Sequence, residues 1–176
     1  MFNIIIPLLI GLIIRTVLVL VFYGGADATN GASFFDYIFS GYDVFYARSP
    51  WPYLPFANVY AWLWGYSAEY LNININLAYR LTSSLYDVGI GVVVYQYVSK
   101  YSPRKAIKSL WLYMINPVTI FIVSLLGFTD STTIFFLLLC CYFSDYFKGR
   151  NSIISSAICL AISISVKPFT FIFIPF

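Results

Sequence analysis

Apolar residues in this chain are gathered into long blocks that short polar stretches separate. A helix at 1.5 Å per residue needs about 20 residues to cross roughly 30 Å of hydrocarbon. The blocks near that length are residues 3–22, 76–98, 109–126, 131–147 and 152–166. A further stretch, residues 56–70, is shorter and carries Asn58 and Glu69. It favours an interfacial or re-entrant helix. The pattern predicts one all-α domain, a polytopic transmembrane helical bundle of about five spans.

Composition supports this fold class. The chain is 61% hydrophobic and 10% charged, and its mean hydropathy is +0.83, far outside the range of soluble globular domains. A net charge of +3 is too small and too dispersed to suggest nucleic acid as a partner. We therefore expect an integral, multi-pass protein surrounded by membrane lipids, in the cell membrane or, in a eukaryote, in the ER membrane.

Basic residues cluster in two short predicted loops. They are Lys100, Arg104, Lys105 and Lys108 in one loop, and Lys148 with Arg150 in the other. The positive-inside rule places both loops in the cytoplasm. If residues 56–70 do not cross the membrane, every loop obeys the rule. The polar loop at residues 24–55, the turn at residues 127–130 and Lys167 then share the extracytoplasmic face.

The residue types present restrict the chemistry. No histidine occurs, which excludes Ser-His-Asp and Cys-His catalysis. The three cysteines lie inside apolar blocks without C-x-x-C spacing, so metal clusters and thiol redox chemistry lack their usual ligands. Any general base must therefore be a carboxylate.

The loop at residues 24–55 holds three of the seven acidic residues and a single base. These are Asp27, Asp36, Asp43 and Arg48. Carboxylates just outside a bilayer either solvate a loop or handle protons for a substrate that arrives through the lipid. The convergence of this loop with Asp130 and Lys167 on one face favours the second interpretation. Arg80, near the outer end of its span, and Lys167 are candidate binders of a lipid phosphate.

Ionisable groups inside the predicted spans are costly and need a reason. Asp87 is mid-span, and we interpret it as a structural partner of Arg80 or Arg15 rather than as a catalytic group. Arg15 either snorkels outward, the interpretation slightly preferred, or pairs within the bundle. Asp130 suits the N-cap of the next helix, a role that can coexist with substrate binding. Proline at Asn116-Pro117 predicts a kink.

Several short motifs occur in a fixed order. They are Tyr37-Ile-Phe-Ser-Gly41 with Tyr46, Trp51-Pro-Tyr53-Leu-Pro55, Asp87 in a span, Trp111 to Asn116-Pro117, Gly127-Phe-Thr-Asp130-Ser131 and Val166-Lys167-Pro168. Together they resemble the multispanning GT-C glycosyltransferases, in particular the catalytic subunit that adds the first mannose to glycosylphosphatidylinositol and related mannosyltransferases. The resemblance implies transfer of a sugar, mannose, from a polyprenyl-phosphate donor to a hydroxyl of a lipid or protein acceptor.

The resemblance also implies site residues. Asp27 falls on the second carboxylate of the family's Asp-x-Asp loop motif, whose first carboxylate is absent because Gly25-Ala26 precedes it. Asp27 is thus the first candidate base and Asp36 the second, with Asp43, Arg48, Arg80, Asp130 and Lys167 as substrate-binding candidates. No metal ligands are predicted and no cofactor is certain, although a lone carboxylate completed by substrate phosphate could hold Mg²⁺ or Mn²⁺.

The family's bundles run to roughly twice this length, so the chain looks like the amino-terminal half of such an enzyme. Two other functions stay open. One is an inactive or partner-requiring lipid-binding fragment that acts with a carboxyl-terminal partner chain. The other is a small transporter with Asp87 and Arg15 as its polar pathway, against which the chain shows no internal repeat.

Overall fold

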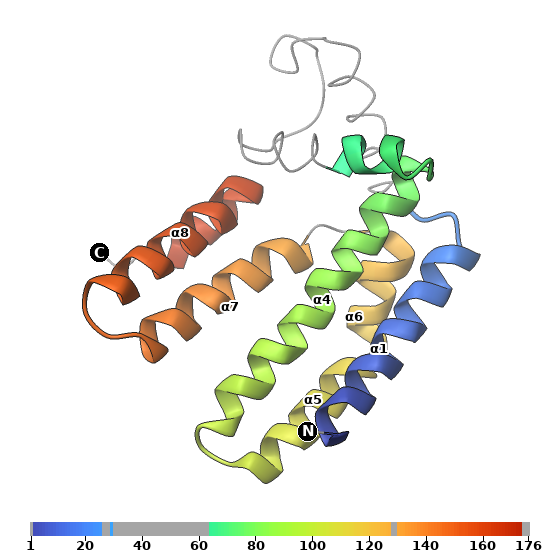
Figure 1. Cartoon of the computed structure of the whole chain (residues 1–176). Coiled ribbons are helices and arrows are strands. Elements are labelled where there is room, and N and C mark those ends of the chain that lie inside the picture. Colours follow the sequence, from blue (N-terminus) through green and yellow to red (C-terminus); the bar gives the residue numbers. More distant parts are fainter. Residues whose placement is uncertain (1, 26–28, 30–63, 128–129, 174–176) are drawn as a thin grey trace, which may run out of the picture.

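The computed structural model describes residues 2–25, 29, 64–127 and 130–173 (Figure 1). Within these ranges the chain forms helices and their connections, with no strand. The predicted all-α fold class is therefore confirmed for the described part. The predicted helix at residues 56–70 is helical over residues 64–70, and its earlier residues lie outside the described part.

Helix α4 (Ile75–Ser99) packs against α1 (Phe2–Val21) and α5 (Pro103–Met114) on one side and against α7 (Asp130–Tyr146) on another. Figure 1 shows α1 and α4 running side by side in opposite directions. The amino terminus of α4 is capped by Asn74, whose side chain accepts a hydrogen bond from the backbone N–H of Asn76 at 2.8 Å. Both helices lie within one residue of the predicted spans.

The predicted kink at Asn116-Pro117 is present. Helix α5 ends at Met114, and a short helix α6 (Pro117–Ile120) continues directly into a π-helix, η1 (Phe121–Leu126). The two halves are bent by 42°. The Asn116 side chain accepts from the N–H of Val118 at 2.9 Å and so caps the second half, while proline occupies its first turn, where no N–H is needed.

One predicted boundary is wrong. The helix expected to begin at residue 109 begins at Pro103, so Arg104, Lys105 and Lys108 lie on α5 and not in the loop with Lys100. Hydropathy marks where apolar residues begin, whereas this helix begins with a proline at its first position, which has the right φ angle and lacks only an unneeded N–H.

Helices α7 and α8 (Arg150–Val166) form an antiparallel pair held by small polar residues. The Ser163 hydroxyl donates to the Thr133 carbonyl at 2.9 Å, and the Ser131 hydroxyl donates to the Ser83 carbonyl of α4 at 2.9 Å. Small side chains let helix backbones approach closely. As predicted, α8 ends before Lys167-Pro168, where Lys167 is extended and a 3₁₀-helix, η2 (Pro168–Phe173), follows.

By length and composition, one described helix could cross a membrane alone, over Asn3–Val21. The bent pair Pro103–Met114 and Pro117–Leu126 could do so together, and Arg150–Val166 is apolar but shorter. A signal sequence or a buried core helix can have the same length and composition. Membrane association is thus weakly supported, and the five-span arrangement stays a prediction.

Candidate functional site

Four predicted site residues, Asp27, Asp36, Asp43 and Arg48, lie outside the described residues. The Mg²⁺ or Mn²⁺ site that Asp27 could form with a substrate phosphate lies outside them as well. Within the described ranges, no group of three or more acidic, cysteine or histidine side chains is placed so that it could hold a metal ion. The other three predicted residues, Arg80, Asp130 and Lys167, are described.

Arg80 lies six residues after the cap of α4 and is 1% exposed. Its Nε donates to the Ser124 carbonyl at 3.2 Å and one terminal nitrogen donates to the Val19 carbonyl at 3.2 Å; the terminal nitrogens also donate to the Phe22 and Ser124 carbonyls. A guanidinium has five N–H groups. Four are therefore donated to backbone carbonyls, and no carboxylate contacts Arg80 among the described residues.

Those carbonyls lie at the carboxyl ends of α1 and η1. Helix carboxyl ends carry unpaired carbonyls and a partial negative charge, roughly half an elementary charge each. The arginine therefore stabilises two helix ends at once, which explains why a buried cation is tolerated there. Its orientation is set by the backbone at these two helix ends and not by a neighbouring acid.

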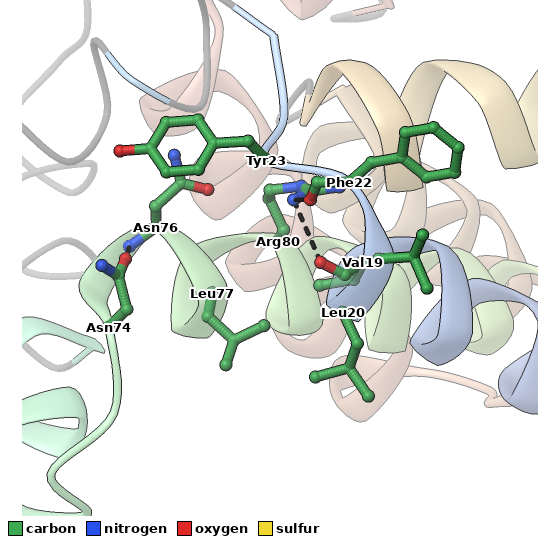
Figure 2. Close-up of a pocket in the computed structure, with 9 residues that line it drawn as sticks. Val19, Leu20, Phe22, Tyr23, Asn74, Asn76, Leu77 and Arg80 are labelled. Atoms are coloured by element: carbon green, nitrogen blue, oxygen red, sulfur yellow. Dashed lines mark hydrogen bonds between the residues drawn. The ribbon is translucent and has the colours of Figure 1, made fainter.

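Arg80 lines a pocket of about 330 Å³, at the lower end of the range of small-molecule sites. The lining residues are Val19, Leu20, Val21, Phe22, Tyr23, Asn74, Asn76, Leu77 and Arg80. Figure 2 shows Asn76 and Arg80 on the same side of α4, beside Tyr23 and Phe22, with Leu77 pointing away from them. The pocket thus combines a fixed cation and two amides with apolar walls. It lies at the end of α1, just before the chain enters the loop predicted at residues 24–55.

Asp130 and Lys167 come together. The Lys167 ammonium lies 2.5 Å from Asp130 Oδ1, and the two side chains are 17% and 38% exposed. Asp130 lies in the first turn of α7, where a carboxylate is favoured by the helix dipole. The pair therefore joins the beginning of α7 to the end of α8, and the lysine already has an anionic partner.

Arg15 and Asp87 form a second, buried pair. The Arg15 terminal nitrogen lies 2.6 Å from Asp87 Oδ2, with side chains 0% and 2% exposed. Arg15 also donates to the Met114 carbonyl at 2.8 Å, and the Tyr113 hydroxyl donates to Asp87 Oδ1 at 2.6 Å. The expected structural partner of Asp87 is confirmed as Arg15, and the preferred snorkelling interpretation of Arg15 is wrong, because the bundle offers it a carboxylate and carbonyls.

The sequence interpretation missed the amides of the pocket and Tyr113. One signal was available for the amides. Asn74 marks the helix cap, and Asn76 stands four residues before Arg80, the spacing that places two side chains on one helix face. For Tyr113 no local signal exists, because its partner Asp87 is 26 residues away.

Comparisons of the chain with protein-family models, curated proteins and solved structures found no match.

Proposed function

We propose that this chain is a multi-pass membrane glycosyltransferase that moves a sugar, mannose, from a polyprenyl-phosphate donor to a hydroxyl of a lipid or protein acceptor. The observation that carries the proposal is the pocket in which buried Arg80 has no carboxylate partner among the described residues. A lipid phosphate needs a cation for its head and apolar surface for its chain. The motifs that resemble GT-C enzymes support the same function.

The proposal requires α4 to cross the membrane although its composition is only moderately apolar. Its 25 residues would extend about 37 Å. Several of its polar residues are buried within the bundle, among them Arg80, Thr82, Ser83, Ser84 and Asp87. Polar groups that face the bundle interior avoid the lipid and its cost.

The order of helices supports one orientation. Figure 1 places the α4–α5 and α7–α8 connections at the same end of the structure as the amino terminus. Lys100 and Lys148 lie in these connections, with Arg104 and Arg150 in the helix turns that follow. In the proposed orientation this end faces the cytoplasm. The Arg80 pocket then lies toward the extracytoplasmic face.

In the proposed reaction, Asp27 or, as second candidate, Asp36 takes the proton of the acceptor hydroxyl while that oxygen bonds to the anomeric carbon of the donor. The bond from that carbon to the phosphate oxygen breaks, and its electron pair leaves with the polyprenyl phosphate. Arg80 stabilises the charge that develops on the phosphate. The further substrate-binding residues that we propose are Asp43, Arg48, Asp130 and Lys167.

A second candidate is a lipid-phosphate-binding chain that transfers no sugar without a carboxyl-terminal partner chain. One observation favours this second candidate: the described pocket lining includes a cation and amides but no carboxylate. Binding would then be a property of this chain, and chemistry would depend on groups supplied from elsewhere.

The test is transfer of radiolabelled mannose from polyprenyl phosphate mannose to endogenous acceptors in membranes that contain the chain. Asp27→Asn should lower transfer by about 100-fold or more, the usual contribution of a general base. The matched control is Glu69→Gln, which neutralises an exposed carboxylate in the helix at residues 64–70. Equal activity of Asp27→Asn and the parent would refute the loop-carboxylate mechanism. Binding of the donor without transfer would instead support the second candidate.

A further inference from the structure

Asn76 carries a carboxamide that lines the Arg80 pocket and that the described part of the fold does not use. The residue is 6% exposed and lines the Arg80 pocket. Its backbone N–H donates to the Asn74 side chain, but its own carboxamide makes no hydrogen bond to the described residues. Asn74 differs, since its side-chain oxygen caps the helix. Thr133 Oγ1 is the one fully buried side-chain polar atom without a hydrogen-bond partner among the described residues. The Asn76 amide atoms therefore reach the pocket, where they can bind water or a ligand.

The position of this amide suggests what it binds. Asn76 and Arg80 stand four residues apart on α4, so their side chains are neighbours on one helix face. Four of the five N–H groups of Arg80 are donated to backbone carbonyls, which leaves one N–H and the positive charge for a phosphate oxygen. A carboxamide both donates and accepts, which suits a hydroxyl group, itself a donor and an acceptor. The pair therefore matches a phosphate with a hydroxyl-bearing group attached to it.

We propose that Asn76 is a specificity-determining residue, which hydrogen-bonds a sugar hydroxyl of a lipid phosphosugar while Arg80 holds the phosphate. This inference rests on the proposed function and names the group by which the same pocket recognises its donor. A site that hydrogen-bonds a substrate hydroxyl discriminates against a ligand that lacks it, because that ligand cannot form the hydrogen bond. The pocket should consequently prefer a glycosylated lipid phosphate to the bare one.

The test compares binding of two probes to the purified full chain in lipid nanodiscs: short-chain polyprenyl phosphate mannose and the same polyprenyl phosphate without sugar. The parent should bind the mannosylated probe about 10-fold more tightly. Asn76→Leu should remove this preference by weakening that probe alone. The matched control is Gln96→Leu, which removes an exposed amide at the other end of α4 and should leave the preference unchanged. Asn76→Ala serves the same purpose if Asn76→Leu does not fold.

The outcomes separate this inference from the proposed function. An unchanged preference in Asn76→Leu, or equal weakening of both probes, would overturn the role of Asn76 while leaving the donor class intact. A preference lost in Asn76→Leu, in a chain that transfers no mannose, would uphold the role and refute the enzyme. Mannose 1-phosphate serves as a third probe. If it binds as tightly as the mannosylated lipid, the lipid part of the inference fails; if neither lipid binds, the whole inference fails.

Discussion

At the scale of single residues, the buried charges of this chain are satisfied in two different ways. Arg15 is paired with a carboxylate, whereas Arg80 is held by backbone carbonyls. The sequence could indicate that Asp87 needs a partner, but it could not distinguish between the two arginines without geometry. Arg80 and Asp87 are seven residues apart on one helix, which places them roughly 10 Å apart along its axis. Arg15 reaches Asp87 because α1 packs against α4.

Removing one partner of the Arg15–Asp87 pair should destabilise the fold, because the other charge then stays buried without a partner. Asp87→Asn would leave a buried guanidinium without a charged partner, and we expect a loss of about 3–5 kcal/mol in the free energy of unfolding. Replacing both residues by leucine should cost less than the single change. Denaturant titration of the purified protein in mixed micelles would measure this.

The control for that experiment is Asp145→Asn. Asp145 is exposed and accepts a hydrogen bond from the Tyr97 hydroxyl at 2.6 Å, so its neutralisation should change stability by about 1 kcal/mol at most. If Asp87→Asn proved no more destabilising than Asp145→Asn, the buried pair would not have the structural role described above.

At the scale of elements, two glycines allow α1, α4 and α5 to meet around one methionine. Met114 is fully buried; a Cβ atom at Gly11 would lie 2.6 Å from its sulfur, and a Cβ atom at Gly91 would lie 2.1 Å from its terminal methyl carbon. Both distances are shorter than real contacts. Helix bounds could be predicted to within a residue or two from apolar blocks, except at α5, but this three-helix contact could not, since it joins residues distant in the sequence.

Gly91→Ala should therefore destabilise the bundle by about 1–3 kcal/mol, the usual cost of an overpacked core. Met114→Ala in the same chain should relieve the clash, so the double variant should lose less than the sum of the two single losses. Thermal unfolding in detergent would measure all three variants. Strict additivity would mean that the Gly91 methyl group does not meet Met114.

At the scale of the whole molecule, the sequence could predict an all-helical chain and the end at which its basic residues gather. Of the described residues that the sequence proposes for the site, Arg80 lines the pocket, whereas Asp130 and Lys167 do not. The pocket itself could not be predicted, because its lining comes from two segments about fifty residues apart and depends on how α1 packs on α4. Nor could the pairing of Lys167 with Asp130, which depends on the packing of α7 on α8.

The proposed orientation can be tested with single cysteines in a variant without the three native ones. Leu71→Cys and Tyr101→Cys place exposed thiols just before and just after α4. In intact cells a membrane-impermeant maleimide should label the first and leave the second unlabelled until the membrane is permeabilised. Labelling of both from outside would show that α4 does not cross and would remove the basis for the five-span arrangement.

The pairing of Arg15 with Asp87 has a consequence for how the chain is made. Arg15 is synthesised first, and its partner follows 72 residues later. In the proposed membrane arrangement, α1 would therefore enter the bilayer carrying a charge with no anion to meet, at a cost of roughly 2.5–3.5 kcal/mol. The first span would be stably inserted only after α4 has entered the bilayer and Asp87 has paired with Arg15. Stable insertion of α1 would therefore depend on a segment that is synthesised later.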